Sequence, residues 1–242
     1  MVDDKKRRNI GFLRMKKLST LFALTSVAFL SGCNCGQSDN EGWTDLFNRD
    51  LSNAIYPAGV WSVTEDGVFK ATKDEIIFSK NDYENFEIEL EFKIEPKSNS
   101  GIVIYCTDTK DWIPNSVEVQ IADSSCESFS KPTWTCGSIF GHVPSEFDTK
   151  LPFGVWHKMR VRCEGQNIDA WLNGKHVSHM DMSKWTDNKV GPDGTVILPW
   201  LTKQKKCDMP TKGKVGLQGK HGGAATDFRN IKIRRKKRRI FF

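Results

Sequence analysis

The chain has 242 residues, 38% of them hydrophobic and 11% aromatic, and a formal net charge of +6. This composition is too apolar for a disordered chain, and the length leaves room for one domain of ordinary size rather than two. No run in the sequence approaches the roughly 20 apolar residues that a membrane-spanning helix needs.

The basic residues are concentrated at the two ends of the chain. Residues 1–32 hold seven Lys/Arg against two Asp/Glu, and six further cations form the run Arg234–Arg239. A nucleic-acid-binding surface needs cations spread over one folded face among stacking aromatic residues. We therefore expect no nucleic-acid partner, and we expect residues 235–242 to form a basic C-terminal tail.

The first 32 residues have the pattern of an export signal. Lys16 and Lys17 precede an apolar run, Leu18–Leu30, which suits a signal-peptide core and is too short to span a bilayer. The alternative is an ordinary secretory signal followed by a cysteine that has no special role.

The end of this segment, Leu30-Ser31-Gly32-Cys33, resembles the lipobox of bacterial lipoproteins. The resemblance implies that Cys33 is lipidated and that residues 33–42, which are polar and small, tether the protein to a membrane. Asn34 resembles the residue found there in lipoproteins sorted to the outer membrane. The expected location is the bacterial cell envelope, lipid-anchored in the outer membrane.

The rest of the chain has the period of two that is typical of half-buried strands. Apolar residues alternate with Glu and Lys from Phe86 to Glu95, and Asp66-Gly67 and Asn173-Gly174 are turn pairs between short strand-like runs. Because no segment forms a convincing amphipathic helix, residues 43–234 are predicted to form an all-β domain, a sandwich of two antiparallel sheets.

Two long irregular stretches interrupt this pattern, residues 123–153 and 183–213. Loops of this length in a compact domain are usually functional or disordered. They carry Trp134, Trp185 and Trp200, which either stack on sugar rings or close the ends of the sandwich.

Export changes what the cysteines are expected to do, because thiols outside the cytosol tend to pair or to be buried. Cys126 and Cys136 share one loop and are the disulfide candidate, whereas Cys106 and Cys163 lie in apolar strand patterns and are expected in the core. No cysteine pair has a zinc-ligand spacing and no H-E-x-x-H is present, so no metal site is predicted.

Five blocks in order resemble one family, the 3-keto-disaccharide hydrolases. The match runs from about Gly42 to Ile233, and the blocks begin at Trp61, Asn85, Asn99, Glu118 and Gly216, the last followed by Phe228-Arg-Asn-Ile. The resemblance implies a concanavalin-like jelly-roll sandwich and an enzyme that removes the aglycone from a sugar already oxidised at carbon 3. It also implies a functional partnership with a sugar oxidoreductase and an oligosaccharide or glycoside substrate.

The chemistry of such a reaction needs a base, an acid and a group that steadies an enolate. On the predicted strand 117–122 the apolar residues face one way, so Glu118 and Gln120 share the other face. Glu118 is the expected general base and Gln120 a ligand of sugar hydroxyls, while His221, in a glycine-rich turn, is the expected acid. No cofactor is evident, and assistance by a divalent cation is left open.

Further substrate-binding candidates come from the same blocks and from the first long loop: Asn99, Asp123, Trp134, Gln218 and Arg229.

Two other functions remain open from the sequence. Sandwich glucanases carry E-x-D-x-x-E on one strand, and here the corresponding residues are Glu118, Gln120 and Asp123, so one carboxylate is replaced by an amide. The same sandwich also serves carbohydrate-binding modules of the lectin or laminin-G type, which have no catalytic activity.

Overall fold

The computed structural model describes residues 42–236. The export signal, Cys33 and most of the tether lie outside the described residues, as do the last six residues of the basic tail. Within residues 42–236 no helix has the length and apolar character needed to cross a membrane.

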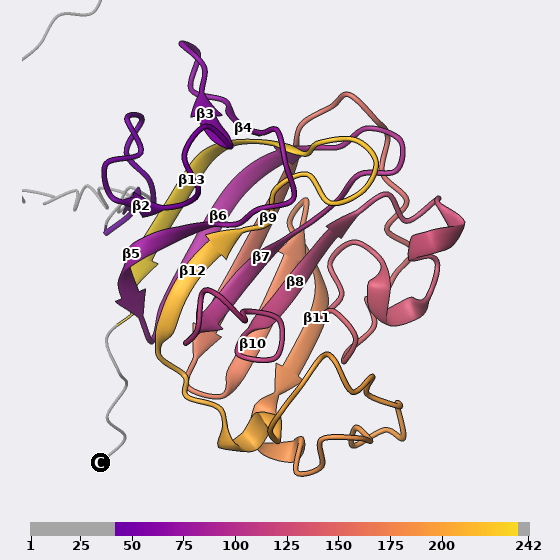
Figure 1. The fold of residues 1–242 in the computed structure, drawn as a ribbon. Coiled ribbons are helices and arrows are strands. Elements are labelled where there is room, and N and C mark those ends of the chain that lie inside the picture. The colour runs from indigo at the N-terminus through magenta and orange to yellow at the C-terminus, as the bar shows by residue number, and fades with distance from the viewer. Residues whose placement is uncertain (1–41, 237–242) are drawn as a thin grey trace, which may run out of the picture. The chain divides into compact units, whose positions relative to one another are not determined.

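The described domain consists of two antiparallel sheets packed face to face (Figure 1), which confirms the predicted all-β sandwich. Sheet A has eight strands in the order β11-β10-β9-β6-β13-β4-β3, with β1 also paired to β13, and sheet B has five in the order β2-β5-β12-β7-β8. In chain order the strands are β1 Thr44–Asp45, β2 Ala54–Ile55, β3 Trp61–Val63, β4 Phe69–Ala71, β5 Ile77–Tyr83, β6 Phe86–Lys93, β7 Asn99–Cys106, β8 Val117–Ala122, β9 His157–Glu164, β10 Asn167–Leu172, β11 Lys175–Asp181, β12 Gly213–Leu217 and β13 Asp227–Arg235.

The core lies between the sheets and is built by the alternation seen in the sequence. On β6 the side chains of Phe86, Ile88, Leu90 and Phe92 are fully buried against sheet B. Both predicted turn pairs connect hairpins, β3–β4 and β10–β11, because Gly67 and Gly174 adopt the positive φ that these turns require.

Charged side chains on the outer face of sheet A form ion pairs with one another. Glu87 is only 3% exposed, since Arg234 on β13 and Lys236 just beyond it both contact its carboxylate. The basic run at the C-terminus therefore begins within β13, and two of its members, Arg234 and Lys236, pair with Glu87.

Two long connections contain no strand and only short 3-10 helices, as the sequence predicts. The β8–β9 connection holds η1 Glu127–Phe129 and η2 Pro132–Trp134, and the β11–β12 connection holds η3 Met182–Lys184 and η4 Lys206–Asp208. Trp185 in the second connection is 5% exposed and packs in the core, while Trp200 is 49% exposed.

The first connection also extends sheet B beyond its last strand. The backbone of β8 exchanges hydrogen bonds with the segment 137–143: Gly137 N donates to Gln120 O at 2.8 Å and Phe140 N donates to Glu118 O at 2.9 Å. This segment lies beside β8 in Figure 1. The outer edge of β8 is therefore already paired.

The cysteines differ from one of the expectations. Cys126 and Cys136 are free thiols, so the structure lacks the expected disulfide. Cys136 is fully buried in the main core, whereas Cys126 lies half-buried just before η1. Cys163 fills the core as predicted, and Cys106 is buried in a smaller apolar cluster.

Candidate active site

The candidate site lies on the face of sheet B that points away from sheet A. On β8 the side chains of Val117, Val119 and Ile121 enter the core, so Glu118 and Gln120 point to the opposite face, as their positions in the sequence predict. The β7–β8 register pairs Glu118 with Val103 and Gln120 with Gly101. We call this surface of sheet B the groove face.

Gly101 makes room for the Glu118 side chain. A Cβ atom at residue 101 would lie 2.0 Å from Glu118 Oε1 and 2.7 Å from its Cδ. No side chain could be tolerated there without displacing the carboxyl group. The glycine of the Asn99-Ser100-Gly101 block is thus explained by the close approach of Glu118.

The Glu118 carboxyl group is buried with few contacts that would stabilise its charged form. The residue is 9% exposed, and its buried Oε1 has no hydrogen-bond partner among residues 42–236. Burial, with a smaller effect from the negative charge of Asp74, raises the pKa of Glu118 to about 8. A carboxylate of that proton affinity is a far stronger base than an ordinary glutamate, provided that it has been deprotonated.

Asn99 and Gln120 lie next to Glu118 on the groove face. Gln120 Nε2 donates a hydrogen bond of 3.1 Å to Asn99 Oδ1, and both residues are buried. Buried amides fixed in this way have an orientation set by their partner, which suits the recognition of hydroxyl groups.

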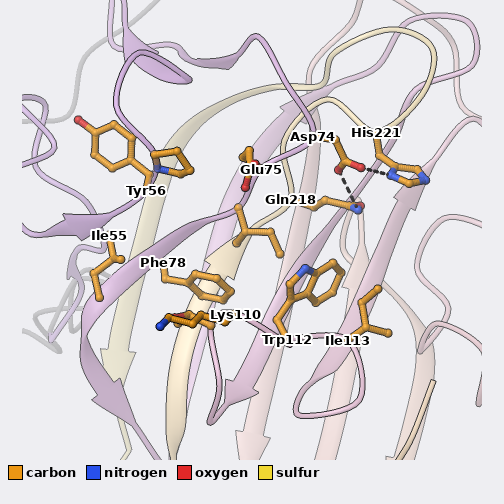
Figure 2. A pocket seen from close by; sticks show the side chains of 13 residues that line it. Ile55, Tyr56, Asp74, Glu75, Phe78, Lys110, Trp112, Ile113, Gln218 and His221 are labelled. Atoms are coloured by element: carbon orange, nitrogen blue, oxygen red, sulfur yellow. Dashed lines mark hydrogen bonds and ion pairs between the residues drawn. The ribbon is translucent and has the colours of Figure 1, made fainter. Parts of the chain in front are cut away.

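His221 is held by a carboxylate that the sequence analysis did not single out. Asp74 Oδ2, from the β4–β5 connection, lies 2.5 Å from His221 Nδ1, and Gln218 Nε2 lies 3.5 Å from the other oxygen of Asp74 (Figure 2). The acidic partner holds the proton on Nδ1, leaving Nε2 to exchange a proton with a ligand. The loop itself is tied to β7, because Gln218 N donates to Gly101 O at 3.0 Å.

A groove of about 560 Å³ opens beside these residues. That volume is in the range of small-molecule sites. One end is polar, with Asp74, Gln218 and His221, and the remaining wall is largely apolar (Figure 2). Its apolar lining consists of Ile55, Tyr56, Pro57, Ile76, Phe78, Trp112 and Ile113.

Glu118 borders a second, smaller cavity that adjoins the groove. Trp112 and Ile113, from the β7–β8 connection, line both spaces, so they separate the groove from the cavity behind it. The influence of Asp74 on the pKa of Glu118 places the base candidate and the His221–Asp74 pair within electrostatic reach of each other.

Three sequence candidates lie elsewhere. Arg229 is on the outer face of sheet A, where its guanidinium contacts Glu91 and stacks on Trp156 at 4.1 Å. The expectation that it shares a substrate with Glu118 is corrected by this position, since the sandwich separates the two faces.

Of the sequence candidates, only Gln218 and His221 line the groove itself and Glu118 lines the smaller cavity, whereas Asp123 and Trp134, like Asn99 and Gln120, line neither space. The Asp123 carboxylate accepts hydrogen bonds from Ser125 and from Lys97 N, which lower its pKa in spite of burial and give it a turn-forming role. The Trp134 ring packs against Phe140 at 5.4 Å and lies beneath the Lys131 ammonium.

Sequence reasoning missed Asp74, Trp112, His142 and Lys206. Asp74 lies in a short polar segment with no sign of function, and the last two meet only because the two long connections pack together. Among the described residues, no three His, Cys, Asp or Glu side chains form a cluster that could hold a metal ion.

Comparisons with known proteins identify the family to which the chain belongs. Residues 39–234 match the sequence model of the family described as a 3-keto-alpha-glucoside-1,2-lyase-like domain. A 3-keto-disaccharide hydrolase of Bacteroides thetaiotaomicron is 24% identical over 235 residues, covering 81% of this chain and 79% of that protein.

Solved structures of similar proteins share this fold. A proposed glycosyl hydrolase from Parabacteroides distasonis is 53% identical with a TM-score of 0.77, covering 80% of this chain and 99% of the other. A Bacillus subtilis protein with a galectin-like fold has a TM-score of 0.52 at 12% identity, covering 81% and 96% of the two chains, and this likeness concerns the fold alone.

Proposed function

Because the chain belongs to the 3-keto-alpha-glucoside-1,2-lyase-like family and is thus a glycoside-cleaving enzyme, we propose that it removes the aglycone from 3-keto-glycosides by elimination. In this proposal Glu118 is the base that takes the proton from C2. His221, held by Asp74, gives a proton to the departing oxygen at C1.

The ketone at C3 makes this route chemically accessible. It acidifies the C2 proton, so the electron pair of the C2–H bond can move into an enolate spread over C2, C3 and the carbonyl oxygen. Collapse of the enolate restores the C3 carbonyl, forms the C1–C2 double bond and breaks the bond from C1 to the aglycone oxygen. Addition of water across the new double bond, with the hydroxyl at C1 and the proton at C2, completes a net hydrolysis.

The observation that carries the proposal is the state of Glu118. Its buried Oε1 has no hydrogen-bond partner among the described residues, its pKa is about 8, and Asp74, which holds the His221 imidazole, is close enough to influence that pKa. Perturbed carboxyl groups next to a groove are typical of acid–base sites. The neutral amide of Gln120, at the place where a glucanase strand carries a second carboxylate, favours elimination over ordinary retaining hydrolysis.

The experiment compares aglycone release from a 3-keto-glycoside and from the same glycoside with an intact C3 hydroxyl. Wild type should cleave only the ketone, and Glu118→Gln should be slower by roughly 10²-fold to 10⁴-fold, the usual contribution of positioned proton transfer. Equal rates on both sugars, or full activity of the variant, would refute the mechanism.

We further propose that the enzyme works in the bacterial cell envelope, anchored by a lipid on Cys33, and that a sugar oxidoreductase supplies its keto substrate. The support for the anchor is the Leu30–Cys33 sequence, and the support for the partner is the chemistry, since a C3 ketone must be made by oxidation of a hydroxyl.

A further inference from the structure

The small cavity beside Glu118 holds an unusual set of buried polar groups. It lies where β8 meets both long connections, and Ser116, Glu118, His142 and Lys206 line it together with apolar side chains. Its volume of about 10 Å³ is at the lower limit of the space that one ordered water needs.

Lys206 is the first of these groups. The residue is 1% exposed and its Nζ donates to Ser116 O at 2.9 Å. An ammonium group has three donors, and no carboxylate among the described residues forms an ion pair with this one. Burial lowers the pKa of Lys206 to about 8. At neutral pH the group is mostly charged, with donors left to satisfy.

His142 supplies a matching acceptor. Its Nδ1 lies 2.7 Å from Phe140 O, which can only accept, so the proton is on Nδ1. Burial and then the charge of Lys206 lower the pKa of His142 to about 3, which keeps the ring neutral. Its Nε2 is therefore a lone-pair acceptor, and it is buried with no partner among residues 42–236.

Two further buried atoms complete the set. Ser116 Oγ and Glu118 Oε1 are also without hydrogen-bond partners among the described residues. Buried polar atoms are almost always paired with protein or with ordered water, and a buried water typically makes two to four hydrogen bonds. One water molecule can form hydrogen bonds with these groups. Lys206 offers a donor, His142 and Glu118 offer acceptors, and Ser116 offers a hydroxyl group.

We propose that this cavity binds one ordered water that accepts a hydrogen bond from Lys206, donates to His142 Nε2 and bridges to the Glu118 carboxyl group. Lys206 is then a positioning residue, which acts on the base candidate through the water without touching the sugar. The link to catalysis rests on the proposed function, whereas the water site itself does not.

The bridge has a consequence for the titration of Glu118. His142 and Lys206 line the cavity together with this side chain, and Asp74, which is paired with His221, disfavours the carboxylate from the groove. A cationic hydrogen-bond chain from Lys206 favours it. Removing Lys206 should therefore raise the pKa of Glu118.

The test follows Glu118 directly, in the full chain and without substrate. Side-chain carboxyl signals of ¹³C-labelled glutamate are titrated in wild type, in Lys206→Met and in Lys205→Met, a control at the exposed neighbouring residue, with Glu118→Gln used for assignment. Lys206→Met should raise the pKa of Glu118 by about one pH unit, and Lys205→Met should leave it unchanged.

A high-resolution crystal structure of the wild type gives the second measurement and does not depend on whether Lys206→Met folds. It should show one water within hydrogen-bonding distance of Lys206 Nζ and His142 Nε2. An unchanged Glu118 pKa in Lys206→Met, or no ordered water in the cavity, overturns the proposal. Failure of the proposed function is a separate result, since it is read from aglycone release.

Discussion

Replacing Glu118 with Gln is expected to make the fold more stable while it makes the enzyme slower. The folded pKa is about 8 against an ordinary 4.5, so between these values the folded protein keeps a proton that the unfolded chain has lost. The free energy of unfolding of wild type therefore falls as the pH rises through this window, and it levels off above pH 8.

The size of the effect follows from the shift. About 3.5 pH units at 1.36 kcal/mol each correspond to roughly 5 kcal/mol across the whole window, as an order of magnitude. The amide side chain of the variant carries no titrating proton, so this part of the pH dependence disappears. The advantage of Glu118→Gln over wild type should then grow by that amount from about pH 4.5 to pH 8.

Urea unfolding of both proteins across this pH range measures the difference, and Glu127→Gln, at an exposed position in η1, is the matched control. At about pH 8 the stabilisation should correspond to roughly 10 °C in Tm for a domain of this size. If Glu118→Gln and wild type show the same pH dependence, the Glu118 carboxyl group is not buried in the way described and the argument for it as a tuned base fails.

Three further predictions concern the site and the anchor. Asp74→Asn should slow aglycone release about 10-fold or more, because His221 loses its orienting carboxylate. It should also lower the pKa of Glu118, because a repelling charge is gone. A pH–rate profile checks both effects, and an unchanged profile would contradict the role of Asp74. Gly101→Ala should lower the rate at least 10-fold with the domain still folded, since the new methyl group displaces the carboxyl group of Glu118. Activity and circular dichroism together test this. Wild-type kinetics in the variant would show that the close approach is unimportant. Cys33→Ala should release the protein from the membrane fraction of its native host, and unchanged fractionation would rule out lipidation at that residue.

The parts of the site that the sequence predicts are those governed by strand parity. Glu118 and Gln120 share a face because side chains alternate along any strand, and no knowledge of the partner strands is needed. Arg229 shows the limit of this reasoning, because alternation says that two residues share a face but does not say on which sheet that face lies.

Contacts between irregular segments could not be predicted. Asp74 meets His221 across 147 positions of sequence, and Lys206 reaches Ser116 across 90. Neither Asp74 nor Lys206 belongs to a periodic pattern, and the packing of two long connections has no local signal. The expected Cys126–Cys136 disulfide failed for the same reason, since nearness in sequence did not reveal that only Cys136 turns into the core.

The pairing of segment 137–143 with β8 bears on how the protein tolerates change. An unpaired edge strand invites a second chain to add to the sheet, which leads to aggregation, and this segment occupies that position on the strand that carries Glu118. Shortening the β8–β9 connection around η1 leaves the edge covered, whereas deletions from η2 to residue 143 expose it, because Gly141 N donates to Thr133 O of η2 and Trp134 packs against Phe140. Engineers who trim this enzyme should find the first part of the connection permissive and the second intolerant, although both look like loop in the sequence.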